Sequence, residues 1–135
     1  MQTLTNFITH TNAQKEPCLA IAKDETELKE FIKILKNQKF KNSKDIFSLL
    51  KAIKSPCDNY FVISENEKEY KNIYDFIVQY PMNQIQMMDK NNNKIIVNPN
   101  YQDISLIFLI TKDNLLKMQK QGFNILNKTG ITFQS

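Results

Sequence analysis

The side chains that most often carry catalysis are few and widely spaced in this sequence. His10 is the one histidine, and the two cysteines, Cys18 and Cys57, form no CxxC pair. The usual zinc sites need several histidine or cysteine ligands at set spacings, so we expect no metal site. A cysteine–histidine nucleophile would require one cysteine to meet His10 in space. Because we expect Cys18 to start a buried strand and Cys57 to lie in a turn, we expect no catalytic residues.

The glycines exclude the common nucleotide-binding loops. Gly122 and Gly130 are the two glycines of the chain, and both lie near its end. A Walker A loop or a GxGxxG fingerprint needs several glycines close together around the phosphates. The segment from Thr111 to Asp113 follows a predicted strand, as a guanine-recognition element would. That interpretation fails because the sequence has no phosphate loop, and helix capping explains the segment. We therefore expect no cofactor.

Carboxylates are the remaining groups for acid–base chemistry. Glu65, Glu67 and Glu69 fall in the first turn of a predicted helix, where negative charge suits the helix dipole. Asp75 lies on the polar side of that helix, and Asp103 precedes a buried strand. No pair among them has a spacing that demands catalysis. An enzyme with a carboxylate- or cysteine-based site stays as an alternative.

The lysines form the most distinctive pattern in the chain. The net charge is +4 and all 18 basic residues are lysine. Lysine offers a point charge where arginine offers bidentate contacts to phosphate or guanine. Lysine, asparagine and isoleucine also share A/T-rich codons, so the high content of these residues can come from the base composition of the genome.

Lysines interleaved with aromatic residues between positions 33 and 54 can bind a polyanion or an acidic protein. A solvated surface with Phe47 in the core fits the same pattern. The candidate binding surface comprises Lys36, Phe40, Lys41, Lys44, Phe47, Lys51 and Lys54.

Hydrophobic periodicity predicts alternating helices and strands. We expect strands at Cys18 to Ala22, Tyr60 to Ser64, Gln84 to Met88, Lys94 to Asn98 and Ile104 to Ile110, and a last hairpin from Phe123 to Leu126 and Ile131 to Phe133. We expect helices around Leu4 to Ile8, after Asp24, from Ser43 to Lys54, from Asn66 to Tyr80, and from Thr111 or Asp113 to a cap at Gly122.

The predicted turns decide the fold class. Three consecutive strands joined by short turns must run antiparallel. This favours a single α+β domain, residues 1–135, over a doubly wound parallel sheet. We expect a mixed or mostly antiparallel sheet with a helical hairpin, formed by the second and third helices, and further helices packed on it.

The helix from Asn66 to Tyr80 has an unusually broad apolar face, spanning about 200°. Such a face is covered on more than one side, so the helix is either central in the fold or meets a partner. Tyr70, Phe76 and Tyr80 form the candidate association surface.

These patterns favour a small non-catalytic protein-binding module, such as an accessory subunit, inhibitor, immunity-type protein or adaptor. Its expected partner is another protein, with self-association as an open alternative. A nucleic-acid-associated protein that uses the lysine-rich 33–54 helical hairpin is the main alternative. No apolar run reaches the length of about 18 residues that a spanning helix needs, and residues 1–13 lack a signal-peptide pattern. We therefore expect a soluble, cytoplasmic protein with no membrane partner.

Overall fold

The computed structural model describes residues 3–13, 17–46, 48–49, 59–80, 84–89, 91–97, 105–129 and 132–134, with the backbone alone for 9–13 and 97. Its elements in chain order are α1 (Leu4–Ala13), β1 (Cys18–Ala22), α2 (Glu25–Asn37), β2 (Lys41–Ser43), β3 (Asn59–Ile63), the 3₁₀-helix η1 (Glu67–Glu69), α4 (Tyr70–Gln79), β4 (Ile85–Met88), β5 (Lys94–Val97), β6 (Ser105–Thr111), α5 (Lys112–Lys120) and β7 (Thr132–Gln134).

The central sheet is parallel. Its strands lie in the order β2-β3-β6-β1-β7, and every pairing within it runs parallel. β4 and β5 form a separate antiparallel hairpin. The mixture of helices and strands in the α+β prediction is confirmed, but the expected mixed or mostly antiparallel sheet is wrong. β6 pairs with β1 and β3 and not with the preceding hairpin.

The parallel arrangement follows from strands that are buried on both faces. Every residue of β1 and of β6 is buried. Leu19 packs with one core cluster, and its neighbours Cys18 and Ala20 pack with the other. Strands covered on both faces read as continuous apolar runs, which is the usual pattern of parallel sheets. The sequence prediction gave more weight to the short turns than to these runs.

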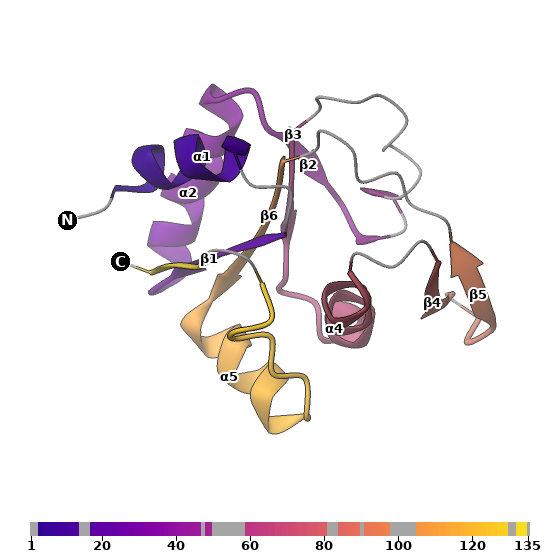
Figure 1. Ribbon diagram of the computed structural model, residues 1–135. Coiled ribbons are helices and arrows are strands. Elements are labelled where there is room, and N and C mark those ends of the chain that lie inside the picture. Colours follow the sequence, from indigo (N-terminus) through magenta and orange to yellow (C-terminus); the bar gives the residue numbers. More distant parts are fainter. Residues whose placement is uncertain are drawn as a thin grey trace.

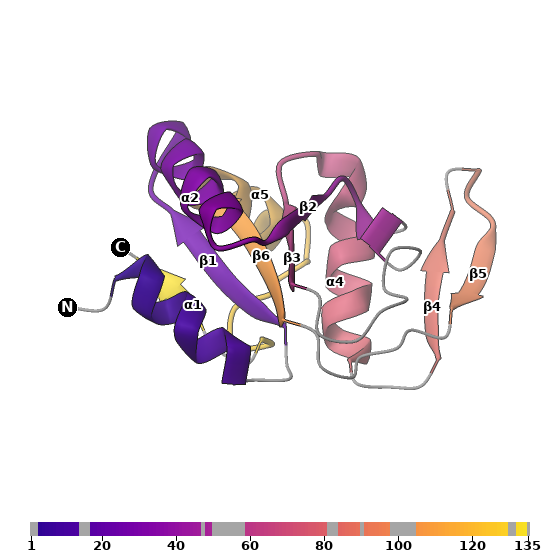
Figure 2. The same cartoon turned by 90° about the horizontal axis from the view of Figure 1, so that it is seen from above.

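Helices cover both faces of the sheet (Figure 1, Figure 2). α1 and α2 bury Phe7, Phe31 and Leu35 against one face. α4 and α5 bury Phe76 and Met118 against the other. The molecule therefore has three layers, with the sheet in the middle.

The expected helical hairpin is wrong. β2 lies in the predicted loop after α2 and pairs with β3, so Ser43 ends a strand. The helical residues Ile46 and Leu49 pack on the face of the sheet opposite to α2. Asp45, not Ser43, caps this turn, since its Oδ1 accepts a hydrogen bond of 2.7 Å from the Ser48 N–H. Residues 50–58, which include the rest of the predicted helix, lie outside the described residues.

The helix start expected after Asp24 and the cap expected at Gly122 are confirmed. Asp24 Oδ1 accepts from the Glu27 N–H at 2.9 Å, and Glu27 Oε1 accepts from the Lys23 N–H at 3.0 Å. Gly122 ends α5 with φ +90°, a left-handed conformation that glycine adopts without strain. These contacts fix where α2 begins and where α5 ends.

The predicted C-terminal hairpin is wrong. β7 pairs parallel with β1, with Ala20 opposite Phe133. Phe123 and Leu126 are in no strand and pack on the core cluster that contains α5. A strand that joins the edge of the sheet buries Phe133 against Phe7 and Phe31, whose rings lie 5.5 and 5.6 Å away.

α4 lies between the central sheet and the hairpin β4–β5 (Figure 1, Figure 2). The ring of Phe76 lies 5.9 Å from that of Phe108 in β6. Ile85 and Met87 of β4 are buried in the same cluster. The broad apolar face of this helix is thus explained by its central position.

Replacing Phe108 with alanine should lower the free energy of unfolding by about 3–5 kcal/mol, because the side chain is fully buried in the middle strand. Urea unfolding followed by circular dichroism measures this change. The control is Leu116→Ala on the exposed side of α5, with a change within about 0.5 kcal/mol. A loss below about 1 kcal/mol for Phe108→Ala would contradict the central place of β6.

Candidate functional site

The lysine-rich candidate surface is only partly present in the described residues. Lys36, Lys41 and Lys44 are exposed. Phe40 is 4% exposed and belongs to the core under α2, so it is no surface aromatic. The Lys41 Nζ lies 5.9 Å from the ring centre of Tyr60. The remaining candidates, Phe47, Lys51 and Lys54, lie outside the described residues.

The candidate association surface is mostly core. Tyr70 and Phe76 are fully buried within the chain. Tyr80 is half-buried, with its ring 6.4 Å from that of Phe76. Tyr70 and Phe76 therefore present no surface to a partner.

Tyr70 belongs to a buried polar chain that joins α4 to α5. Its hydroxyl donates to Asn114 Oδ1 at 2.7 Å, and Asn114 Nδ2 donates to Thr111 Oγ1 at 3.1 Å. Burial, with a smaller effect of the Glu67 carboxylate, raises the pKa of the Tyr70 hydroxyl above its usual 10.0. The hydroxyl thus stays protonated and donates, which is a structural role.

A crevice of about 360 Å³ lies at the carboxyl ends of β2 and β3, where ligands often bind in parallel sheets. Two of its polar side chains bond to the local backbone. Asp45 caps the turn at Ser48, and Asn66 Oδ1 accepts from the Lys68 N–H at 3.1 Å. Among the described residues no group of three or more histidine, cysteine, aspartate or glutamate side chains is suited to hold a metal ion.

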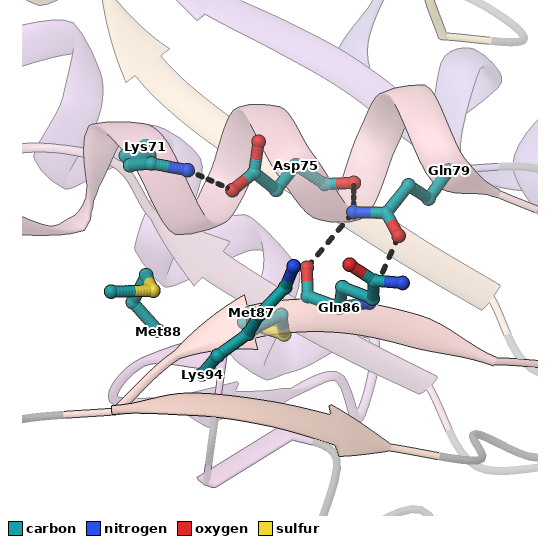
Figure 3. A pocket seen from close by; sticks show the side chains of 7 residues that line it. All are labelled: Lys71, Asp75, Gln79, Gln86, Met87, Met88 and Lys94. Atoms are coloured by element: carbon teal, nitrogen blue, oxygen red, sulfur yellow. Dashed lines mark hydrogen bonds and ion pairs between the residues drawn. The ribbon is translucent and has the colours of Figure 1, made fainter. Parts of the chain in front are cut away.

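A second cavity, of about 230 Å³, forms a groove between α4 and the hairpin (Figure 3). We call it the α4–hairpin groove. Lys71, Asp75 and Gln79 line it from α4, where a spacing of four residues places them on one side of the helix. The hairpin contributes Gln86, Met87, Met88 and Lys94.

The groove carries an excess positive charge. Lys71 Nζ lies 2.6 Å from Asp75 Oδ2, and these side chains are 56% and 19% exposed. Lys94 extends from β5 across β4 toward α4 (Figure 3). Within the part of the chain that the structure describes, Lys94 has no ion-pair partner. One lysine charge is therefore left uncompensated beside the hairpin.

Side-chain amides of α4 close the outer edge of β4 (Figure 3). Gln79 Nε2 donates to the Gln86 carbonyl at 3.0 Å, and Gln79 Oε1 accepts from the Gln86 N–H at 2.9 Å. Asn72 Nδ2 also donates to the Met88 carbonyl at 3.3 Å. The two bonds of Gln79 reproduce what a neighbouring strand would supply at Gln86.

The edge of β5 has no such cover among the described residues. Gln86 lies opposite Ile96 and Met88 opposite Lys94. The Gln86 N–H and carbonyl bond to Gln79 and therefore point away from β5. Gln86–Ile96 and Met88–Lys94 are thus the non-hydrogen-bonded pairs of the ladder, in which the main-chain groups of both residues point away from the partner strand. The N–H and C=O groups of Lys94 and Ile96 thus point outward from β5. The Ile96 side chain is 59% exposed.

Sequence reasoning located the hairpin but missed this difference between its edges. No sequence pattern marks the contact between Gln79 and Gln86, seven residues apart across the intervening segment. One sequence feature could have indicated it. In the run Lys94 to Val97, Ile96 stands where strict alternation of apolar and polar residues would place a polar residue.

No protein-family model matches the chain, and a search of curated proteins finds no relative. None of the helices in the described ranges has the length and apolar character needed to cross a membrane.

Replacing Gln79 with glutamate should lower the free energy of unfolding by about 1–3 kcal/mol at neutral pH. The variant keeps the size of the side chain but loses the Nε2 donor to the carbonyls of Gln86 and Asp75. The control is Gln86→Glu, which brings the same charge to the groove and leaves the main-chain bonds in place. Equal stability of the two variants in urea unfolding would contradict the closing role of Gln79.

Tyr70→Phe should lower stability by about 1–3 kcal/mol at pH 7, because Asn114 Oδ1 loses its donor in a buried site. The folded-state pKa of Tyr70 is raised, so its contribution is fully present below pH 10 and is lost as the pH rises through the folded-state pKa. The difference in stability between wild type and variant should therefore shrink only above about pH 10. A difference that shrinks between pH 7 and 9 in unfolding measurements would contradict this assignment.

Proposed function

We propose that this protein is a protein-binding module that takes an extended segment of its partner as an additional strand on β5. The observation that carries the proposal is the contrast between the two edges of the hairpin. Gln79 and Asn72 bond to main-chain groups of Gln86 and Met88 in β4. The main-chain groups of Lys94 and Ile96 in β5 point outward. Strand addition to an open edge is a recurring way for proteins to recognise extended segments.

The exposed apolar side chain supports this proposal. Proteins usually protect an edge strand with charges, proline, bulges or a covering element, because an open edge invites pairing with other chains. Here α4 protects one edge, and Ile96 stands exposed beside the other. A partner strand would bury part of Ile96 and satisfy the outward groups.

The hairpin is well anchored for such a role. An isolated two-stranded hairpin is marginally stable in water. Burial of Ile85 and Met87 against α4 contributes about 1.5–3 kcal/mol for each side chain. These contacts hold the edge of β5, which no described residue covers, in place before a partner arrives. A polyanion-binding role for residues 33–54 has weaker support, because Phe40 is buried.

Replacing Ile96 with proline tests the proposal directly. The Ile96 N–H points away from β4, so proline removes an outward donor without removing a bond of the hairpin. In affinity capture from the native cell extract, proteins retained by the wild type should be lost with Ile96→Pro. Mass spectrometry identifies them.

The matched control is Leu116→Thr in α5. The Leu116 side chain is 53% exposed, similar to Ile96 at 59%. This variant should retain the same proteins as the wild type. Amide spectra and melting curves check that Ile96→Pro keeps the fold. Unchanged capture by a folded Ile96→Pro variant would contradict strand addition at β5.

A further inference from the structure

We infer that the α4–hairpin groove binds a small α-amino acid with an apolar side chain. Asp75 of α4 receives the ammonium group of this ligand, Lys94 of β5 receives its carboxylate, and the two methionines of β4 contact its side chain. The site is separate from the edge of β5, because the Lys94 side chain leaves that edge and crosses β4 toward α4 (Figure 3).

The groove has a charge of each sign on its two walls. Asp75 lines it from α4, and Lys94 lines it from the hairpin. Among the described residues, these two side chains form no ion pair with each other, and Lys94 forms none with any other residue. A ligand that carries both charges can bridge the two walls. An α-amino acid has an ammonium group and a carboxylate on one carbon atom, so it can make a charge-assisted hydrogen bond to each wall.

Asp75 keeps the capacity to bind a second cation. Its Oδ2 lies 2.6 Å from Lys71 Nζ, and no other described residue pairs with this carboxylate. An ionised carboxylate offers about four lone-pair sites, so one bond to Lys71 leaves sites for an ammonium group. The Asp75 side chain is only 19% exposed. Partial removal from water strengthens its attraction for a cation in the groove.

The amide of Gln79 is already used within the chain. Its Nε2 donates to the main-chain carbonyls of Asp75 and Gln86, both at 3.0 Å. Its Oε1 accepts from the Gln86 N–H at 2.9 Å. Both hydrogens of this amide are therefore occupied, and the charged side chains of the groove are the groups that orient a ligand.

The size and the methionines of the groove set the class of ligand. Its volume of about 230 Å³ lies below the range of roughly 300–1,000 Å³ that suits drug-sized molecules. Met87 is buried and Met88 is half-buried, and both line the groove. Methionine side chains adapt to apolar groups of varied shape. A single amino acid with an aliphatic side chain, such as leucine, matches these features.

A dianion such as inorganic phosphate fits the groove less well. The charged groups that line it are two lysines and one aspartate. A second negative charge on the ligand would be repelled by Asp75, whereas the ammonium group of an amino acid is attracted to it. The aspartate thus favours a ligand with charges of both signs.

Leucine and two analogues that each lack one charged group test the inference. The analogue 4-methylpentanoate lacks the ammonium group, and 3-methylbutylamine lacks the carboxylate. Chemical-shift titration of the full chain measures their affinities at ~50 mM salt, where charges are less screened than at physiological salt. Leucine should bind about 10-fold tighter than either analogue, because a hydrogen bond to a charged group contributes at least that factor.

Single substitutions assign each charge. Asp75→Asn should weaken binding of leucine and of 3-methylbutylamine about 10-fold and leave that of 4-methylpentanoate undiminished. Lys94→Gln should weaken binding of leucine and of 4-methylpentanoate by the same factor and leave that of 3-methylbutylamine undiminished. The matched control is Lys117→Gln, which removes an exposed lysine of α5 outside the groove and should change none of the affinities.

Three results would overturn the amino-acid site. They are equal affinities for leucine and 4-methylpentanoate, tighter binding of inorganic phosphate than of leucine, and no shift of the groove amides at ~10 mM leucine. A ligand of this size should have a dissociation constant on the order of 1 mM. Ile96→Pro, which blocks the proposed strand addition, should leave leucine binding unchanged, so the failure of one proposal is distinguishable from the failure of the other.

Discussion

The apolar face of α4 spans about 200° of the helix, and the need to bury it determines where the rest of this half of the molecule lies. One layer cannot cover such a helix, because a sheet contacts only one side of it. Phe76 meets Phe108 of the central sheet, and Ile85 and Met87 of the hairpin join the same cluster. The hydrophobic effect thus fixes the hairpin against a helix that the sheet already holds.

This placement makes the two edges of the hairpin unequal. β4 runs beside α4, whose Gln79 and Asn72 reach its main-chain groups. β5 lies on the far side of β4 from the helix (Figure 1, Figure 2). α4 therefore protects one strand and leaves the main-chain groups of Lys94 and Ile96 directed outward. The proposed binding mode depends on this asymmetry.

The sequence was most informative where a local pattern determines the structure. The apolar run of β1, the cap at Asp24 and the left-handed Gly122 are local features, and each was predicted within a residue. Which strands pair is decided by contacts far apart in the chain. The parallel sheet was missed although the buried runs of β1 and β6 are typical of it.

The candidate site was less predictable than the fold. Asp45 caps its turn in place of Ser43, because β2 extends into the predicted loop and uses Ser43 as a strand residue. The broad apolar face of α4 indicated that the helix is covered on more than one side. It did not indicate whether this chain or a partner provides the covering residues. The bonds of Gln79 to the Gln86 main chain depend on how the hairpin docks, and no spacing of polar residues encodes them.

Amide hydrogen exchange along the hairpin of the wild-type protein tests the unequal edges most directly. In the register of β4 and β5, the Ile95 N–H faces β4 and the Ile96 N–H faces outward. The account predicts slow exchange for the amides of Ile95 and Gln86, which are hydrogen-bonded, and fast exchange for Ile96. Equal protection of Ile95 and Ile96, or fast exchange at Gln86, would contradict it.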